Sequence, residues 1–328
     1  MDCNKPVLAA RQDRIEIPQS MYIPEGEVRS VLTYEALIPA IRQALIDYSA
    51  GLTDQPARMV LRAGNAEGAR NGWFAVMPVI SGEWMAVKTV TFFPGNAELG
   101  LDTHMAVIEL LRRATGEPLA VMDGRLITEM RTAAVSAVAL QTLAPVVFAN
   151  GPRSLGILGS GVQAAAHIRA LRLVCPALTE IRIWSRNAAH AEKLAAEAGG
   201  RAVAVDEAAA ADVVVTATSS PIPVLEGRRL AARSIVLAVG ATGASLRELD
   251  DEAMQSGVVI AESRSAVERE SGDVRLSGAR VQAEIGDILA GSTKLEPAPR
   301  IIFKSVGMAI EDLTAARLVW QARSRAQE

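Results

Sequence analysis

The chain has 328 residues, half of them apolar, and a formal net charge of −3. This length is enough for two domains with hydrophobic cores, and the composition excludes a disordered chain. Lysine and arginine form no basic stripe with interleaved aromatic residues, so we expect no nucleic-acid partner.

Cysteine and histidine are too few and too scattered for a metal site or a disulfide framework. The cysteines are Cys3 and Cys175, and the histidines are His104, His167 and His190. No spacing among them matches a zinc-ligand pattern, so we expect no bound metal.

No segment is typical of export or of a membrane protein. The first 25 residues carry charges and lack the apolar core of a signal peptide. Thr132–Ala149 is apolar, but it is short and is interrupted by Gln141 and Pro145, which predicts a buried helix. We therefore expect a cytoplasmic protein that does not bind membranes.

The first third of the chain predicts one long helix and a mixed or antiparallel sheet. Tyr34–Ala50 has apolar side chains at helical spacing, with Thr33 as the N-cap and Gly51 as the stop. Short β-like runs follow at Met59–Leu61, Trp73–Ile80, Met85–Phe93, Met105–Leu111 and Leu119–Met122. A boundary near Ile127–Arg131 leads through an alanine-rich helix into a second domain.

The rest of the chain alternates between strands and helices. The predicted strands are Leu155–Leu158, Glu180–Trp184, Ala202–Val205, Val213–Ala217, Ser234–Val239 and Val258–Ala261. The predicted helices are Val162–Val174, Ala188–Ala198 and Ala309–Ala322. This alternation is typical of βαβ units with a parallel sheet, so we expect an α/β fold whose last helix returns to the first domain.

A glycine motif lies at the first strand-to-helix turn of the second domain. Its residues Gly159-Ser160-Gly161-Val162-Gln163-Ala164 match G-x-G-x-x-A. Gly159 allows a tight turn, Gly161 lets the backbone approach phosphates, and Ala164 permits close packing of helix and strand. A turn without a ligand has the same pattern, but the alternating strands and helices favour a dinucleotide site.

The end of the second predicted strand bears on the choice of dinucleotide. NAD sites usually have an acidic residue there, whereas this strand ends in Ser185-Arg186-Asn187. The guanidinium of Arg186 suits a ribose 2′-phosphate, although a solvated surface arginine is the plainer alternative. We favour NADP(H) and keep NAD(H) as possible.

Several motifs occur in a characteristic order along the chain. They are RTAAVSAVA (Arg131–Ala139), ILGSGVQA (Ile157–Ala164), ESGDV (Glu270–Val274), AEIGD (Ala283–Asp287) and FKSVGMAIEDLTAA (Phe303–Ala316). From about Gln55 to its end the chain resembles the ornithine cyclodeaminase/mu-crystallin family. Three further stretches, PLAVMDG, IRIWSRN and RELDDE, are most similar to its ketimine reductase branch.

The resemblance implies a Rossmann dinucleotide-binding domain plus a sheet-based domain for substrate binding and dimerisation. The expected ranges are 1–130 for the substrate domain, 131–311 for the Rossmann domain, and 312–328 for a C-terminal helix that rejoins the first domain. It also implies a homodimer that associates through the outer face of the N-terminal sheet.

The resemblance further implies which residues bind the substrate, a small imino or amino acid. Arg58, Lys88 and Arg131 match cations that hold its carboxylate, and His104 matches a histidine beside the site. Guanidinium groups bind carboxylates bidentately, and Lys88 lies in an apolar alternation where a lysine needs a partner. The expected cofactor-binding residues are Gly159, Ser160, Gly161, Val162, Gln163, Ser185, Arg186, Asn187, Thr218, Gly240 and Lys304.

One position departs from the cyclodeaminases and the related alanine dehydrogenases. They carry an aspartate in the loop after the fifth Rossmann strand, where this chain has Thr242. Releasing ammonia from an amine needs a base, and threonine cannot act as one at neutral pH. Another carboxylate in its place is an alternative, with Glu284 and Asp312 the nearest by motif.

The sequence therefore predicts a reductase that delivers hydride to a preformed C=N bond of a cyclic ketimine carboxylate. Lys88 is the first candidate for protonating the imine nitrogen, with Arg58, Arg131 and Thr242 as the other catalytic candidates. The alternatives are an ornithine cyclodeaminase, another amino-acid dehydrogenase of the family, and a small-molecule binding protein.

Overall fold

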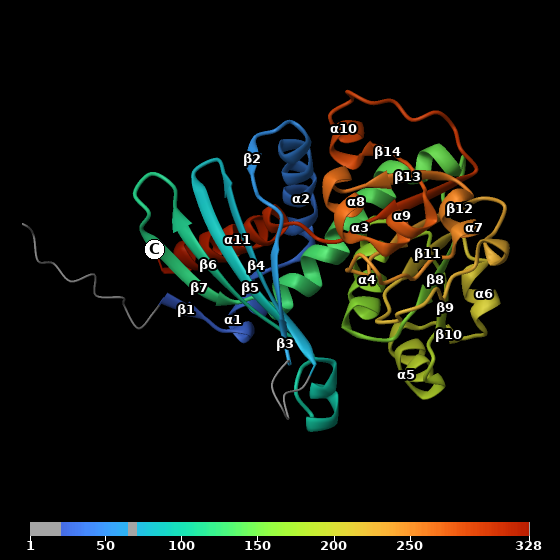
Figure 1. Ribbon diagram of the computed structural model, residues 1–328, viewed down its shortest axis with the longest axis horizontal. Helices are drawn as coiled ribbons and strands as arrows, with labels where there is room; N and C mark the ends of the chain where they lie inside the picture. Colours follow the sequence, from blue (N-terminus) through green and yellow to red (C-terminus); the bar gives the residue numbers. More distant parts are fainter. Residues whose placement is uncertain (1–20, 65–70, 328) are drawn as a thin grey trace, which may run out of the picture.

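The computed structural model describes residues 21–64 and 71–327. Two sheets form two lobes, with the chain's first strands in one lobe and its Rossmann-type alternation in the other (Figure 1). The expectations for Cys3 and for a signal peptide lie largely or wholly outside the described residues.

The first sheet is mixed, as predicted, and its strand order is β1-β7-β6-β5-β4-β2, with β3 also paired to β4. Strands β4 to β7 pair antiparallel to their neighbours, and β1 joins β7 in parallel. Their bounds are β1 Tyr22–Ile23, β2 Thr53–Asp54, β3 Met59–Ala63, β4 Gly72–Ser81, β5 Trp84–Phe92, β6 His104–Arg112 and β7 Pro118–Asp123; a 3-10 helix, η2, spans Pro94–Leu99.

One face of this sheet is covered by α11 (Ala309–Gln327), which packs against β4, β5 and β6 and against α2 (Tyr34–Ser49). The short helix α1 (Glu25–Val31) packs beside them on α3 and α11. Thr33 caps α2 by accepting a hydrogen bond from the Ala36 amide at 3.3 Å, as predicted. Figure 1 shows the red C-terminal helix back in the lobe that holds the blue beginning of the chain.

Helix α3 (Arg125–Val147) joins the lobes. It packs against α2 and α11 on one side and against α4 and β12 on the other. The helix is long and apolar enough to cross a membrane by length and composition, but 72% of its most apolar window is buried inside the protein. It is therefore the core helix that the sequence predicted. The expected boundary at residues 130 and 131 falls inside α3, and that at 311 and 312 falls inside α11, because both helices continue without a break.

The second sheet is parallel and has the order β10-β9-β8-β11-β12-β15-β13-β14. Its strands are β8 Ser154–Leu158, β9 Glu180–Trp184, β10 Arg201–Ala202, β11 Val213–Thr216, β12 Ser234–Ala238, β13 Val258–Ala261, β14 Val281–Glu284 and β15 Arg300–Lys304. The order reverses direction between β8 and β11, and open parallel sheets bind ligands at the carboxyl ends of strands at such a point.

Helices cover both faces of this sheet. Helices α3, α4 (Val162–Val174) and α5 (Ala188–Ala198) pack on one face, and α6 (Val205–Ala209) packs on the other. The remaining elements are η3 Gly227–Arg229, α7 Asp251–Gln255, α8 Arg264–Glu270, α9 Gly272–Ser277 and α10 Ile285–Leu289. One continuous cluster of buried apolar residues runs from Ile108 in the first sheet through Val138 of α3 to Ile301 in the second.

Two local predictions for the second sheet were wrong or incomplete. The strand predicted at Ala202–Val205 ends at Ala202, because Val205 already begins α6. Strands β14 and β15 were not predicted as strands. Arg300–Lys304 has a charge at each end of a short apolar run, and its burial in the middle of the sheet comes only from its neighbours β12 and β13.

Candidate active site

The glycine turn after β8 has the geometry of a phosphate-binding loop. Gly159 has φ +127°, and a Cβ there would lie 2.4 Å from the carbonyl oxygen of Ala217, so only glycine fits. A Cβ on Gly161 would meet nothing within 4 Å, and α4 begins after it with no side-chain cap. The first amides of α4 are thus open to an anion, which fits the pyrophosphate of a nicotinamide dinucleotide.

The neighbouring predicted cofactor residues hold the ends of β8 and β9 together. The Ser160 hydroxyl donates to the Ser185 hydroxyl at 2.9 Å, and Asn187 caps α5 by accepting from the His190 amide. Arg186 is exposed at the end of β9, and Val162 is exposed at the start of α4. Among these residues Arg186 is the cation.

Thr218 and Gly240 belong to a buried network that shapes the loops after β11 and β12. The carboxylate of Glu248 accepts from the Thr218 amide at 2.6 Å, the Thr218 hydroxyl at 2.8 Å and the Gly240 amide at 2.7 Å. A Cβ on Gly240 would lie 2.4 Å from atoms of Thr218 and of Glu248. These contacts fix the shape of the two loops beside the glycine turn.

Lys304 does not have the position expected of a cofactor ligand. Its side chain is fully buried, its amine lies 2.8 Å from the Asp273 carboxylate, and it donates to the Ala241 carbonyl at 3.1 Å. Asp273 in turn accepts from the amides of Glu248 and Leu249. In this arrangement Lys304 supports the loop after β12 through Asp273 and Ala241, and its contact with the cofactor stays a prediction.

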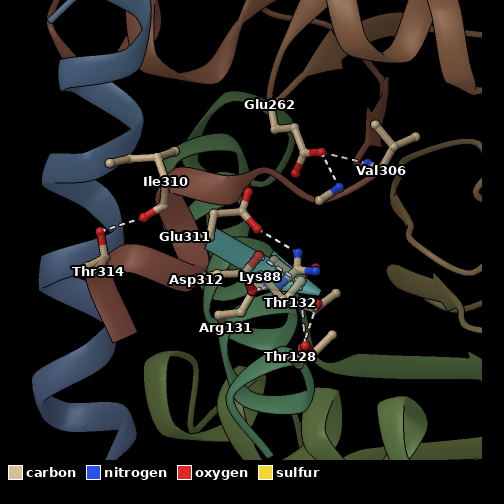
Figure 2. A network of polar contacts seen from close by, with 12 residues as sticks. Lys88, Thr128, Arg131, Thr132, Glu262, Val306, Ile310, Glu311, Asp312 and Thr314 are labelled. Atoms are coloured by element: carbon tan, nitrogen blue, oxygen red, sulfur yellow. Dashed lines mark hydrogen bonds and ion pairs between the residues drawn. The ribbon is translucent and has the colours of Figure 1, made fainter. Parts of the chain in front are cut away.

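The three predicted substrate cations converge between the two lobes. Lys88 on β5 places its amine 2.6 Å from Asp312 on α11, and the other oxygen of Asp312 lies 3.2 Å from Nε of Arg131 on α3. Arg131 also donates to Glu311 at 2.6 Å. Figure 2 shows Lys88, Arg131, Glu311 and Asp312 gathered where α11 begins.

Arg58 reaches the same place from the segment before β3. Its Nε lies 2.7 Å from Glu270, and its Nη2 donates to the carbonyls of Val306 at 2.8 Å and Gly307 at 2.5 Å. Gly307 has φ +81°, and a Cβ there would lie 2.5 Å from Nη1 of Arg131. The loop that joins β15 to α11 therefore lies between the guanidinium groups of Arg58 and Arg131 and contacts both.

Thr128 connects this cation cluster to the nucleotide turn. Its hydroxyl lies 3.5 Å from the Lys88 amine, and its carbonyl accepts from the side chain of Gln163 at 3.4 Å. Gln163 belongs to the glycine motif and is in the first turn of α4. The cation cluster and the first turn of α4 are therefore joined through one residue of α3.

Burial and neighbouring charges set the protonation of the site. Burial lowers the pKa of Lys88 to about 8, although Asp312 opposes the shift. Burial, followed by the charges of Lys88 and Arg131, lowers the pKa of His104 to about 4, so this histidine is neutral at neutral pH. Burial acts to lower the pKa of Arg131, but Asp312, Glu311 and Glu262 together raise it.

The family model described as ornithine cyclodeaminase/mu-crystallin matches residues 20–327. The chain belongs to this family. It is 39% identical to ketimine reductase mu-crystallin of Mus musculus over 297 residues, which covers 88% of this chain and 92% of that protein.

Two further relatives match most of the chain. A Δ1-pyrroline-2-carboxylate/Δ1-piperideine-2-carboxylate reductase of Azospirillum brasilense is 34% identical, over 89% of this chain and 92% of that protein. The solved structure of Thermococcus litoralis Δ1-pyrroline-2-carboxylate reductase with NADH and L-proline aligns with a TM-score of 0.84 at 28% identity, covering 94% of this chain and 98% of that chain. The resemblance that the sequence motifs predicted is confirmed.

Within this member of the family, Thr242 is half-buried in the loop after β12. The next residue, Gly243, donates its amide to the Glu270 carbonyl at 2.8 Å, so the loop is tied to the residue that pairs with Arg58. Of the two alternative carboxylates, Glu284 accepts from the Ser49 hydroxyl and the Arg264 amide, away from the cations. Asp312 alone of the two lies among them.

Sequence reasoning did not find the other carboxylates of the cluster, Glu262, Glu270 and Glu311. Glu262 directly follows the buried strand β13, and Glu311 begins the buried face of α11. A charged residue inside an apolar run was the available signal, and it was applied only to Lys88. Among the described residues no group of histidine, cysteine and carboxylate side chains is arranged to hold a metal ion.

Proposed function

We propose that this protein is an NAD(P)H-dependent reductase of cyclic ketimine carboxylates of the pyrroline-2-carboxylate or piperideine-2-carboxylate type. The observation that carries the proposal is the cation cluster of Arg58, Lys88 and Arg131, linked through Thr128 to the first turn of α4. One site then has a partner for each reacting part of the substrate: its ring nitrogen, its carboxylate, and the carbon between them. The Azospirillum brasilense relative is named for these two substrates, and the Mus musculus relative is named a ketimine reductase.

The arginines orient the substrate. Nη1 of Arg131 donates a hydrogen bond to Glu311, and its Nε lies beside Asp312. Its Nη2 makes no hydrogen bond to any described residue. A carboxylate bound to this free edge is held by a guanidinium that its own partners keep in place. The bound nicotinamide supplies hydride to the carbon of the C=N bond.

Lys88 is suited to hold a proton at the substrate nitrogen. Its pKa of about 8 is close to the operating pH, which favours proton donation, and Asp312 keeps the amine charged in a buried position. The neutral His104 adds no competing positive charge beside it. Lys88 therefore stabilises the protonated imine or donates to it, while Asp312 holds the amine in place.

The deciding experiment compares two reactions. The purified protein with NADPH or NADH is expected to reduce both cyclic ketimines, measured as loss of reduced-nicotinamide absorbance. It is expected to release no ammonia from L-ornithine with NAD, because Thr242 cannot take a proton from an ammonium whose pKa is about 10. Ammonia and proline formation at rates equal to ketimine reduction would restore the cyclodeaminase alternative, with Asp312 as its base.

For the cofactor, we propose a preference for NADP(H), supported by the free charge of Arg186 and the lack of an acidic residue at the end of β9. Arg186→Ala is expected to weaken NADPH binding by about 10- to 100-fold, because a charge-assisted pair contributes roughly 1.5–3 kcal/mol, and to leave NADH binding unchanged. Titration of cofactor fluorescence measures both affinities. Arg182→Ala, on the same strand, is the matched control. Equal affinities of the unmodified protein for the two cofactors contradict the preference.

We also propose a homodimer formed by the first sheet. Its outer face exposes Met105 and Val107 on β6, and β3 exposes Met59, Val60 and Leu61. Several exposed apolar side chains on one sheet favour a protein interface. Val107→Glu is expected to weaken the dimer in sedimentation equilibrium, whereas Leu276→Glu, at an exposed position on α9, is expected to have no effect. An unmodified protein that is monomeric at micromolar concentration contradicts the proposal.

A further inference from the structure

Two fully buried carboxylates meet where β13 ends and α11 begins. One oxygen of Glu262 accepts from the amides of Val306 at 2.6 Å and Gly307 at 2.5 Å, and one oxygen of Glu311 accepts from Arg131 at 2.6 Å. The other oxygens, Glu262 Oε2 and Glu311 Oε1, are buried and accept no hydrogen bond from any described residue. Figure 2 shows the two carboxyl groups facing each other.

Two ionised carboxylates in this arrangement are unfavourable. They repel each other without solvent between them, and each leaves a charged oxygen buried without a donor. A single proton between the unpartnered oxygens removes both problems, because one carboxyl group then donates to the other. In agreement with this, burial and then Glu262 raise the pKa of Glu311 well above the ordinary value of 4.5.

The charges around the pair point to the same conclusion. Arg131 on α3 and Asp312 on α11 face the pair directly, and Lys88 on β5 pairs with Asp312. Arg58 and its partner Glu270 lie across the loop that joins β15 to α11. This cluster has three cations, Arg58, Lys88 and Arg131, and four carboxylates, Glu262, Glu270, Glu311 and Asp312. One bound proton makes the two charges equal in a site shielded from water.

We propose that Glu262 and Glu311 share one proton, and that this bridge positions the guanidinium groups of Arg58 and Arg131. Glu262 holds the amides of Val306 and Gly307, whose carbonyls accept from Arg58. Glu311 holds Arg131, which lies against Gly307. The bridge between Glu262 and Glu311 completes this closed set of contacts. It thereby connects the nucleotide-binding sheet to both arginines. This inference rests on the proposed function in one respect only: the substrate carboxylate that the two arginines bind is taken to be that of an imino acid.

The shared proton is tested without substrate, by the pH dependence of stability. The folded protein holds a proton that the unfolded chain releases above about pH 4.5, so the stabilisation is complete below that pH and is lost as the pH rises through the raised pKa of Glu311. Glu311→Gln keeps the bridge without a proton, because its amide donates to Glu262 and its oxygen still accepts from Arg131. The unfolding constant of the wild type relative to this variant is expected to rise about tenfold per pH unit within that window.

A second readout and a control make the test specific. The wild type is expected to show the infrared band of a protonated carboxyl group at neutral pH, and Glu311→Gln is expected to lack it. Glu268→Gln, the same change at an exposed position of α8, is expected to keep both the band and the wild-type pH dependence. Equal pH dependence of the wild type and Glu311→Gln, with no carboxyl band in the wild type, overturns the shared proton.

The positioning role is tested by kinetics. Glu311→Met keeps the side-chain volume but cannot accept from Arg131, and it is expected to raise KM for the imino acid at least about tenfold with a smaller change in kcat. Glu311→Gln is expected to restore KM to within about threefold of the wild type. Equal KM values for Met and Gln variants overturn the positioning role. A wild type inactive on every ketimine refutes the proposed function instead, and the stability and infrared measurements still decide the shared proton.

Discussion

Arg131→Ala is expected to lower kcat/KM for cyclic imino acids by at least about 100-fold, which corresponds to roughly 3 kcal/mol for losing a buried charge-assisted contact. The change removes the free guanidinium edge and also leaves Glu311 and Asp312 without a partner on α3. Because the lost contact orients the carboxylate before and during hydride transfer, both KM and kcat are expected to change. Steady-state kinetics with saturating reduced cofactor measures the effect.

Arg169→Ala is the matched control for Arg131→Ala. Arg169 also pairs with a glutamate, Glu129 at 2.7 Å, but its side chain is 56% exposed on α4. Exposed ion pairs contribute little, so this variant is expected to keep kcat/KM within about twofold of the wild type. An Arg131→Ala protein that folds, binds cofactor and keeps kcat/KM within tenfold of wild type removes Arg131 from the substrate site.

Asp312→Asn is expected to move the alkaline limit of activity to lower pH. In the wild type, activity that needs charged Lys88 is lost as the pH rises through about 8, the pKa that burial and Asp312 together set. Asp312 raises this pKa, so without its charge the pKa falls further, and the limit is expected to shift down by at least about one pH unit. Near neutral pH this shift alone lowers kcat/KM by at least about twofold, and losing the carboxylate that holds the amine in place brings the expected loss to about 100-fold or more.

The pH profile of kcat/KM distinguishes this effect from a general loss of structure. A damaged fold lowers the whole profile, whereas a shifted Lys88 moves its alkaline limb. Asp251→Asn, at an exposed ion pair with Arg247, provides the matched control and is expected to leave the profile unchanged. A profile of Asp312→Asn with the wild-type alkaline limb, only scaled down, contradicts the assignment of the proton to Lys88.

The sequence predicted the elements whose signals are local. The glycine turn, Thr33 at the start of α2, and strands β9 and β13 follow from spacing and capping within a few residues, and the structure has them at the predicted places. The need of Lys88 for a partner also followed from its apolar neighbours, since an unpaired charge in a half-buried strand is unfavourable.

Only the tertiary structure decided which groups meet. Asp312 is 224 positions after Lys88 along the chain, and α11 brings them together by crossing the first sheet. The same packing pairs Lys304 with Asp273, and it buries Glu262 near Glu311. Sequence motifs thus determined the family, the nucleotide turn and the kind of charges in the site. Partners and protonation depend on distance and burial, which arise only when separate segments pack together.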